Sequence, residues 1–203
     1  MFVIITAGGI GSRMNLCIPK QFVEIGNKPI LMHSISAFYS YSNNIQIIVT
    51  LPENEIIEWQ KLVLKHAFDI KHTVVAGGKT RFHSIKNALK LVDNNSLVAI
   101  HDGVRPFVST NLIENGFLTA EKNSSAIPMI PVKDSIRIMN KNYPSTIERS
   151  KVFSIQTPQV FDSNKIIQAY KCPYSPKFTD DSTVYEKKFG KIYTYEGITE
   201  NIK

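Results

Sequence analysis

The sequence predicts an α/β fold built on a mostly parallel sheet, and two observations support this. Short apolar runs rich in β-branched residues alternate with segments of helical spacing through the first half of the chain. Several of these runs end at Gly-Gly or at an aspartate, as strands often do where their carboxyl ends face a ligand. The length of 203 residues suits one domain, spanning 1–203. We therefore expect βαβ units whose right-handed crossovers bring the carboxyl ends of the strands to one edge.

The individual elements follow from these patterns in order along the chain. The first expected strand, 2–7, is a short apolar run closed by Gly8-Gly9. The helix that follows over 31–39 carries apolar residues at helical spacing, and Pro29 suits its first turn. The same patterns predict strands at 45–51, 73–76, 97–101, 126–131 and 192–195, and helices at 53–66, 85–92, 164–170 and 181–189.

The segment 132–154 differs from the rest of the chain. Two stretches of alternating character, 135–138 and 147–153, flank a polar turn region at 140–145. The segment has too few apolar residues to form a core of its own. We expect a protruding β-hairpin arm within the single domain, packed against a twofold partner.

Composition and charge limit the classes of partner. Lysine and arginine exceed aspartate and glutamate by 24 to 17, which gives a net charge of +7. This balance favours anionic partners such as nucleotides and sugar phosphates. The basic residues are scattered rather than clustered, so a nucleic-acid-binding tail is not expected.

The cysteines and the apolar runs indicate a cytoplasmic protein. Two cysteines, Cys17 and Cys172, do not make a disulfide scaffold, and no CxxC or HExxH zinc motif is present. No apolar stretch reaches the length of a membrane span, and the N-terminus lacks the basic region of a signal peptide. We expect no membrane partner.

The loop after the first strand has the features of a polyphosphate site. Three glycines in four positions, Gly8, Gly9 and Gly11, let the backbone turn sharply and aim N–H groups at an anion. Arg13 and Lys20 add positive charge. The loop matches neither the dinucleotide-binding fingerprint nor the P-loop motif. The alternative interpretation is a glycine-rich turn with two solvated basic side chains.

Two further loops follow expected strands. In Gly77-Gly78-Lys79-Thr80-Arg81-Phe82-His83-Ser84, Gly78 could let a flat base approach the backbone and Ser84 could hydrogen-bond it. In His101-Asp102-Gly103-Val104-Arg105-Pro106, an aspartate after a buried strand with an arginine three residues later suits a metal–phosphate or hydroxyl contact. The alternative for the first loop is a plain turn followed by helix caps. The alternative for the second is an Asx turn with an Arg–Asp ion pair. We assign His101 to the sheet.

Taken together, these motifs resemble a known enzyme family. The order Ala-Gly-Gly-x-Gly-x-Arg-Met, Pro-Lys-Gln, Gly-Gly-x-x-Arg-x-x-Ser and His-Asp-x-x-Arg-Pro is similar to that of cytidylyltransferases acting on methylerythritol phosphate or ribitol phosphate. Arg149-Ser150 before Gln156-Thr157-Pro158-Gln159, with Thr179-Asp180-Asp181 following, looks like the methylerythritol phosphate branch. The resemblance covers the whole chain. It implies a Rossmann-like α/β domain with helices on both faces of the sheet and a hairpin arm that forms a homodimer.

The resemblance also implies roles for particular residues. Arg13, Lys20, Arg149 and Lys203 would be catalytic, stabilising transition-state charge or positioning the polyol phosphate. The groups around CTP would be Ala7, Gly8, Gly9, Gly11, Gly78, Ser84 and Asp102. Those around the polyol phosphate would be Asp102, Arg105, Ser135, Arg149, Thr157, Thr179 and Lys203. Mg²⁺ is expected, held mainly through the CTP phosphates, and Arg149 is expected to serve the partner subunit's site.

The sequence departs from the family pattern at its end. Family members continue past Asn-Ile-Lys, whereas Lys203 is the last residue here. We expect poor order from Gly197 onward and weakened binding of the polyol phosphate, because terminal residues fray unless they are tied down. A truncated chain, a ribitol 5-phosphate enzyme and an inactive nucleotide-binding regulator remain alternatives at this point.

Overall fold

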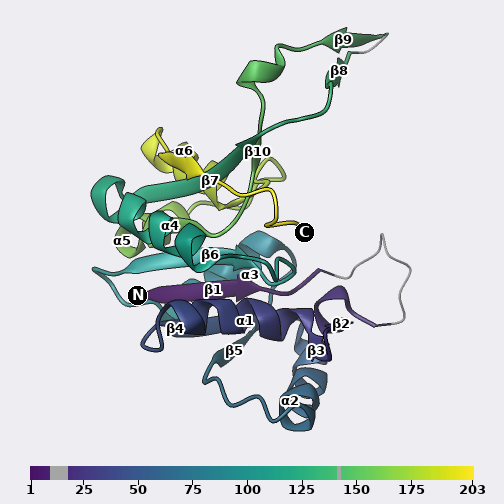
Figure 1. Ribbon diagram of the computed structural model, residues 1–203. Helices are drawn as coiled ribbons and strands as arrows, with labels where there is room; N and C mark the ends of the chain where they lie inside the picture. Colours follow the sequence, from purple (N-terminus) through teal and green to yellow (C-terminus); the bar gives the residue numbers. More distant parts are fainter. Residues whose placement is uncertain (10–17, 141–142) are drawn as a thin grey trace.

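The computed structural model describes residues 1–9, 18–140 and 143–203, which fold around one mixed sheet (Figure 1). The strands of this sheet are β1 (Phe2–Thr6), β4 (Gln46–Leu51), β5 (Thr73–Ala76), β6 (Leu97–Asp102), β7 (Ser125–Pro131), β10 (Phe153–Ile155), β11 (Gln159–Asp162) and β12 (Thr194–Glu196). Their order is β10-β7-β11-β6-β1-β4-β5, with β12 pairing to β7. The pairs β5–β4, β4–β1 and β1–β6 are all parallel. These four strands therefore end at one edge of the sheet, as predicted.

Helices cover both faces of this sheet (Figure 1). They are α1 (Ile30–Tyr41), α2 (Ile56–Lys65), α3 (Arg81–Ala88), α4 (Thr110–Asn123), α5 (Ser163–Ala169) and α6 (Asp181–Phe189). Short 3₁₀ turns occur at η1 (Lys20–Phe22), η2 (Glu53–Glu55), η3 (Leu89–Leu91) and η4 (Arg149–Lys151), and a small hairpin joins β2 (Glu24–Ile25) to β3 (Lys28–Pro29). The mostly parallel α/β architecture is confirmed.

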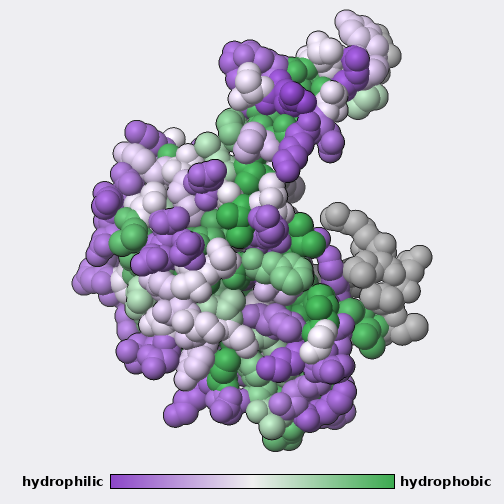
Figure 2. Space-filling view, in the orientation of Figure 1, coloured by the Kyte–Doolittle hydropathy of each residue, from purple (hydrophilic) through white to green (hydrophobic). Residues whose placement is uncertain are grey.

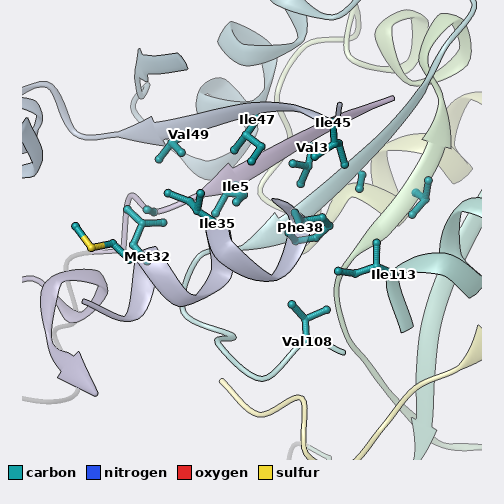
Figure 3. Close-up of a cluster of buried hydrophobic side chains, with 14 of the residues drawn as sticks. Val3, Ile5, Met32, Ile35, Phe38, Ile45, Ile47, Val49, Val108 and Ile113 are labelled. Atoms are coloured by element: carbon teal, nitrogen blue, oxygen red, sulfur yellow. The ribbon is translucent and has the colours of Figure 1, made fainter. Parts of the chain in front are cut away.

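The side chains of β1 show how the two faces are filled. Val3 and Ile5 point into one apolar cluster, which α1 and α4 cover with residues such as Phe38 and Ile113 (Figure 3). Phe2 and Ile4 belong to a second cluster on the opposite face, which α3, α5 and α6 cover. Successive side chains of a strand point to opposite faces, so a strand buried on both sides must be apolar throughout. This explains the continuous apolar run that β1 shows in the sequence.

Helix α4, strand β11 and the short hairpin of β2 and β3 were not predicted from the sequence. Helix α4 is capped by Ser109, whose hydroxyl accepts a hydrogen bond from the Leu112 amide, but Gly116 interrupts its pattern and several poor helix formers surround it. Strand β11 has four residues and lies antiparallel between β6 and β7. Its neighbours come from distant parts of the chain, so no local pattern announces it.

The hairpin arm is formed by β8 (Arg137–Met139) and β9 (Pro144–Thr146), which pair antiparallel. It stands clear of the body of the molecule (Figures 1 and 2). Its return strand, β10, rejoins the main sheet beside β7, so the projecting part is shorter than the predicted 132–154. Ile138, Met139 and Tyr143 are exposed on it.

The segment after β12 corrects a prediction from the sequence. The Gly197 amide donates to the Met129 carbonyl at 2.9 Å, and the Gln156 side chain bonds both the amide and the carbonyl of Ile198. Asn201 is fully buried. The expectation that the chain is poorly held from Gly197 onward is therefore wrong through Asn201, because buried amide contacts tie the segment to the body.

Candidate active site

A cleft of about 780 Å³ opens at the shared edge where the parallel strands end. Thr6, Thr50 and Asp102 stand at the carboxyl ends of β1, β4 and β6, and all three line the cleft. Ligands of open α/β sheets bind at this edge. Of the residues predicted to contact ligands, the described part of the lining includes Ala7, Gly8, Gly9, Lys20, Gly78, Ser84, Asp102 and Lys203. Gly11 and Arg13 lie outside the described residues.

The two glycine loops differ in how much room they leave. A Cβ atom at Gly8 or Gly9 would meet no described atom within 4 Å, so these positions leave space beside the backbone. At Gly78, by contrast, a Cβ would lie 2.4 Å from the Cβ of His83. Only glycine fits at Gly78, and its N–H donates to the Ser84 hydroxyl at 3.0 Å.

Ser84 has a structural function in this loop. Its hydroxyl accepts from Gly78 and donates to the Thr80 carbonyl at 3.2 Å, and the side chain is almost fully buried. These two bonds hold the start of α3 against the Gly77-Gly78 turn. The loop wall that faces the cleft is therefore rigid before any ligand arrives, which lowers the entropic cost of binding a flat group there.

Lys20 is presented to the cleft by a firmly anchored turn. The neighbouring Gln21 is buried and donates from Nε2 to Glu55 Oε2 at 2.6 Å. Phe22 stacks on Trp59 with ring centroids 6.0 Å apart. Burial raises the pKa of the Glu55 carboxyl above its ordinary value, although the Gln21 hydrogen bond opposes this. The turn fixes where the Lys20 side chain begins.

Asp102 is the electrostatic centre of the cleft. Its Oδ2 lies 3.0 Å from Lys203 Nζ and 3.3 Å from Arg105 Nε, and its Oδ1 lies 3.7 Å from Arg81 Nη2. Burial alone would raise the pKa of Asp102, but Arg81 and Lys203 outweigh burial and hold it well below its usual range. Asp102 is therefore ionised throughout the neutral range.

Arg81 lines the cleft, although no role was predicted for it. Its Nη2 lies 2.7 Å from Oδ2 of Asp181, a fully buried carboxylate whose Oδ1 accepts from the Tyr170 hydroxyl at 2.6 Å. The two carboxylates beside Arg81 raise its pKa above the ordinary value despite burial. An arginine three residues after Gly78, in the segment that follows a strand end, was the signal that could have identified it.

His101 belongs to the core, as predicted. Its Nε2 pairs with the Arg105 carbonyl at 3.2 Å and its Nδ1 with the Thr157 hydroxyl at 3.1 Å. Burial lowers its pKa to about 4, so the ring is neutral at physiological pH. Because a carbonyl only accepts, Nε2 carries the proton and Thr157 donates to Nδ1. Thr157 in turn accepts from the Asp102 amide at 3.1 Å, which places it behind the cleft wall.

Five of the residues predicted to contact the polyol phosphate are not in the described lining of this cleft: Arg105, Ser135, Arg149, Thr157 and Thr179. Ser135 is exposed at the base of the arm, and Thr179 is exposed just before α6. Arg149 lies in η4, where its Nη1 donates to the Lys133 carbonyl at 2.9 Å. It borders a separate hollow with Pro131, Val132, Lys133 and Ser150. The prediction that Arg149 serves a partner subunit is compatible with this position and remains a prediction.

Within the described part of the chain, no helix has the length and apolar character needed to cross a membrane. Nor does any cluster of three or more His, Cys, Asp or Glu side chains gather there in a way that would hold a metal ion.

Comparisons with known proteins agree with the motifs. The family model for 2-C-methyl-D-erythritol 4-phosphate cytidylyltransferase, IspD, matches residues 1–203. A protein of that name from Bacteroides fragilis is 44% identical over 98% of this chain and 91% of its own length. One from Azobacteroides pseudotrichonymphae is 47% identical over 100% of this chain and 91% of its own length.

Solved structures give the same result. The 4-diphosphocytidyl-2C-methyl-D-erythritol synthase of Anaerococcus prevotii superposes with a TM-score of 0.83 at 30% identity, covering 100% of this chain and 88% of its own. The cytidylyltransferase of Francisella tularensis superposes with a TM-score of 0.79 at 28% identity, covering 100% of this chain and 92% of its own. With its motifs, its cleft and these likenesses in agreement, the chain belongs to the 2-C-methyl-D-erythritol 4-phosphate cytidylyltransferase family.

Proposed function

We propose that this chain transfers the cytidylyl group of CTP to 2-C-methyl-D-erythritol 4-phosphate and releases pyrophosphate, as a cytoplasmic enzyme of non-mevalonate isoprenoid precursor synthesis. Membership of the family supports this activity over a ribitol phosphate enzyme or an inactive regulator. The observation that carries it within the molecule is the cleft at the strand ends. Its described lining brings together residues of both glycine loops, Asp102 and Lys203.

The charge of the cleft suits two anionic substrates. Its described lining carries the cations Lys20, Lys79, Arg81 and Lys203 against the carboxylates Glu53 and Asp102. Asp102 is already matched by Arg81, Arg105 and Lys203, so the cleft as a whole remains attractive to phosphates. The glycine loops would receive the triphosphate and the base of CTP, and the Asp102 side would receive the polyol phosphate.

The reaction needs positioning and charge stabilisation more than covalent help. A phosphate oxygen of the polyol phosphate attacks the α-phosphorus of CTP, a new P–O bond forms, and the bond to the bridging oxygen breaks as pyrophosphate leaves. The attacking phosphate is already an anion at neutral pH, so no general base is required. Lys20, with Arg13 earlier in the sequence, would stabilise the charge that gathers on the α-phosphoryl oxygens.

The described lining of the cleft offers few carboxylates to a Mg²⁺ ion. Glu53 and Asp102 are the carboxylates of the described lining, and Asp102 is already bound by cationic side chains. Mg²⁺ prefers to keep waters and to bind one or two carboxylates together with substrate phosphates. The ion would therefore be held mainly by the oxygens of CTP with Asp102 beside them, where it would neutralise charge on the triphosphate.

The arm supports a homodimer as the working state. Ile138 is 48% exposed, Met139 is 76% exposed and Tyr143 is 66% exposed, and all three lie on a projecting two-stranded hairpin. Isolated two-stranded hairpins are marginal in water, so a partner chain that covers these side chains would stabilise the arm. Arg149 at the base of the arm would then serve the partner subunit's cleft.

A substrate panel tests the proposal. The four nucleoside triphosphates are each paired with 2-C-methyl-D-erythritol 4-phosphate and with ribitol 5-phosphate in Mg²⁺ buffer, and pyrophosphate release is followed. We expect the highest kcat/KM for CTP with the methylerythritol phosphate. A higher value for ribitol 5-phosphate would overturn the substrate, and no release from any pair would overturn the activity.

A further inference from the structure

The end of the chain is held by side-chain amides rather than by a sheet or helix. Beyond β12, Gln156 Nε2 donates to the Ile198 carbonyl at 2.8 Å and Gln156 Oε1 accepts from the Ile198 amide at 3.2 Å. Asn201 Nδ2 donates to the Thr157 carbonyl at 2.7 Å. We call Gln156 and Asn201, with these bonds, the terminal latch. Gln156 is 4% exposed and Asn201 is 0% exposed, so the bonds form where water cannot replace them.

The terminal latch also connects to the cleft cations. The Asn201 carbonyl accepts from Arg105 Nη1 at 2.6 Å and, at 3.4 Å, from Gln156 Nε2. Arg105 in turn bonds Asp102, to which Lys203 Nζ is also bound at 3.0 Å. The backbone carbonyl of Asn201 therefore bonds both Gln156 of the terminal latch and Arg105, one of the cations around Asp102.

The terminal latch restricts the position of the Lys203 backbone. Two residues of extended chain span at most about 7 Å, so Asn201 confines the Lys203 backbone to a small region. Ile202 is 59% exposed, so hydrophobic burial contributes little to holding the last two residues. Gly197 lies close against the same latch, since a Cβ there would be 2.6 Å from Gln156 Oε1.

We infer that Gln156 and Asn201 are positioning residues that hold the Lys203 ammonium at the polyol-phosphate side of the cleft. This rests on the proposed function, in which Lys203 binds that substrate's phosphate. Neither side chain is in the described lining of the cleft, so both act through Lys203 rather than on a substrate directly. In the proposed function the glycine loops bind the nucleotide, and none of the bonds of the terminal latch involves those loops, so we expect nucleotide binding not to depend on the latch.

The variants Asn201→Leu and Gln156→Met test this without burying a new charge. Both keep roughly the volume of the side chain and remove the amide donor. Asn201 Oδ1 has no partner among the described residues, so leucine also removes a buried unpaired acceptor, which favours folding of the variant. Asn164→Leu is the matched control, because the Asn164 amide bonds Asn95 in an exposed position away from the cleft.

Two measurements are made on the full chain. Amide hydrogen exchange in the peptide covering 197–203, without substrates, should be about tenfold faster in each latch variant, the loss expected from one buried hydrogen bond. KM for 2-C-methyl-D-erythritol 4-phosphate should rise about tenfold in each, whereas the Kd for CTP should stay within about twofold. The control should match the wild type in both.

A double-mutant cycle separates positioning from general structural damage. In a Lys203→Ala chain, Asn201→Leu should no longer change KM for the polyol phosphate, because the group that it positions is gone. An equal effect in both backgrounds, or unchanged exchange in 197–203, would overturn the inference. Failure of the proposed function would look different, since the wild-type chain itself would then release no pyrophosphate while exchange still reported on the latch.

Discussion

Replacing Arg81 by methionine should destabilise the fold through a carboxylate on another helix. Asp181 is fully buried, and its Oδ2 lies 2.7 Å from Arg81 Nη2. Removing one partner of a buried ion pair costs about 3–5 kcal/mol, because the remaining charge is left without compensation. The Arg81 side chain is 32% exposed, so water from the cleft would reach part of the vacated space. We therefore expect a loss of about 3 kcal/mol, at the lower end of that range.

Urea unfolding at pH 7, followed by far-ultraviolet circular dichroism, measures this loss. Lys61→Met is the matched control, because Lys61 pairs with Glu58 at 3.3 Å where the side chains are 69% and 54% exposed. Such a surface pair contributes about 0–1 kcal/mol. The double variant Arg81→Met with Asp181→Asn should recover much of the lost stability, since it removes the uncompensated charge.

Two results would refute this reasoning. If Arg81→Met lost no more stability than Lys61→Met, Asp181 would not depend on Arg81. If the double variant were no more stable than Arg81→Met alone, the loss would come from packing rather than charge.

Arg81→Met should also raise the pKa of Asp102 toward its ordinary value, because Arg81 is one of the cations that lower it.

Three further predictions concern pH, charge stabilisation and assembly. The unfolded chain protonates His101 near pH 6.5 and the folded chain only near 4, so this residue should lower stability by roughly 3 kcal/mol as pH falls across that window; an assigned His101 imidazole NMR signal that titrates near 6.5 in the folded protein would contradict this. Lys20→Ala should lower kcat by about 10²–10³-fold with little change in folding, and near-normal kcat would remove Lys20 from the mechanism. Mixing Arg149→Ala chains with Lys20→Ala chains should restore some pyrophosphate release, because one hybrid cleft would hold both intact residues; no rescue in hybrid dimers shown to form would place Arg149 in its own subunit's cleft.

The local elements were predictable where one stretch of sequence carried the whole signal. Strand β5 was expected at 73–76 and lies at Thr73–Ala76. Helix α6 was expected at 181–189 and lies at Asp181–Phe189, where Asp180 forms a capping box with Thr183. Helix α4 was missed because Gly116 and weak helix formers interrupt the helical spacing of its apolar residues. Its burial against α1 and β7 outweighs this weak propensity.

The sequence by itself determined the alternation of strands and helices and the glycine loops at strand ends, because these depend on the periodicity and backbone freedom of neighbouring residues. Only the tertiary structure decided which side chains meet in the cleft. Lys203 reaches Asp102 across 101 residues, and Arg81 reaches Asp181 across 100. Such contacts are set by strand order and by the insertion of β11 between β6 and β7, which arise from burying two faces of one sheet at once. The latch on the last residues belongs to this second group, since a buried glutamine far upstream holds a segment whose own sequence predicts fraying.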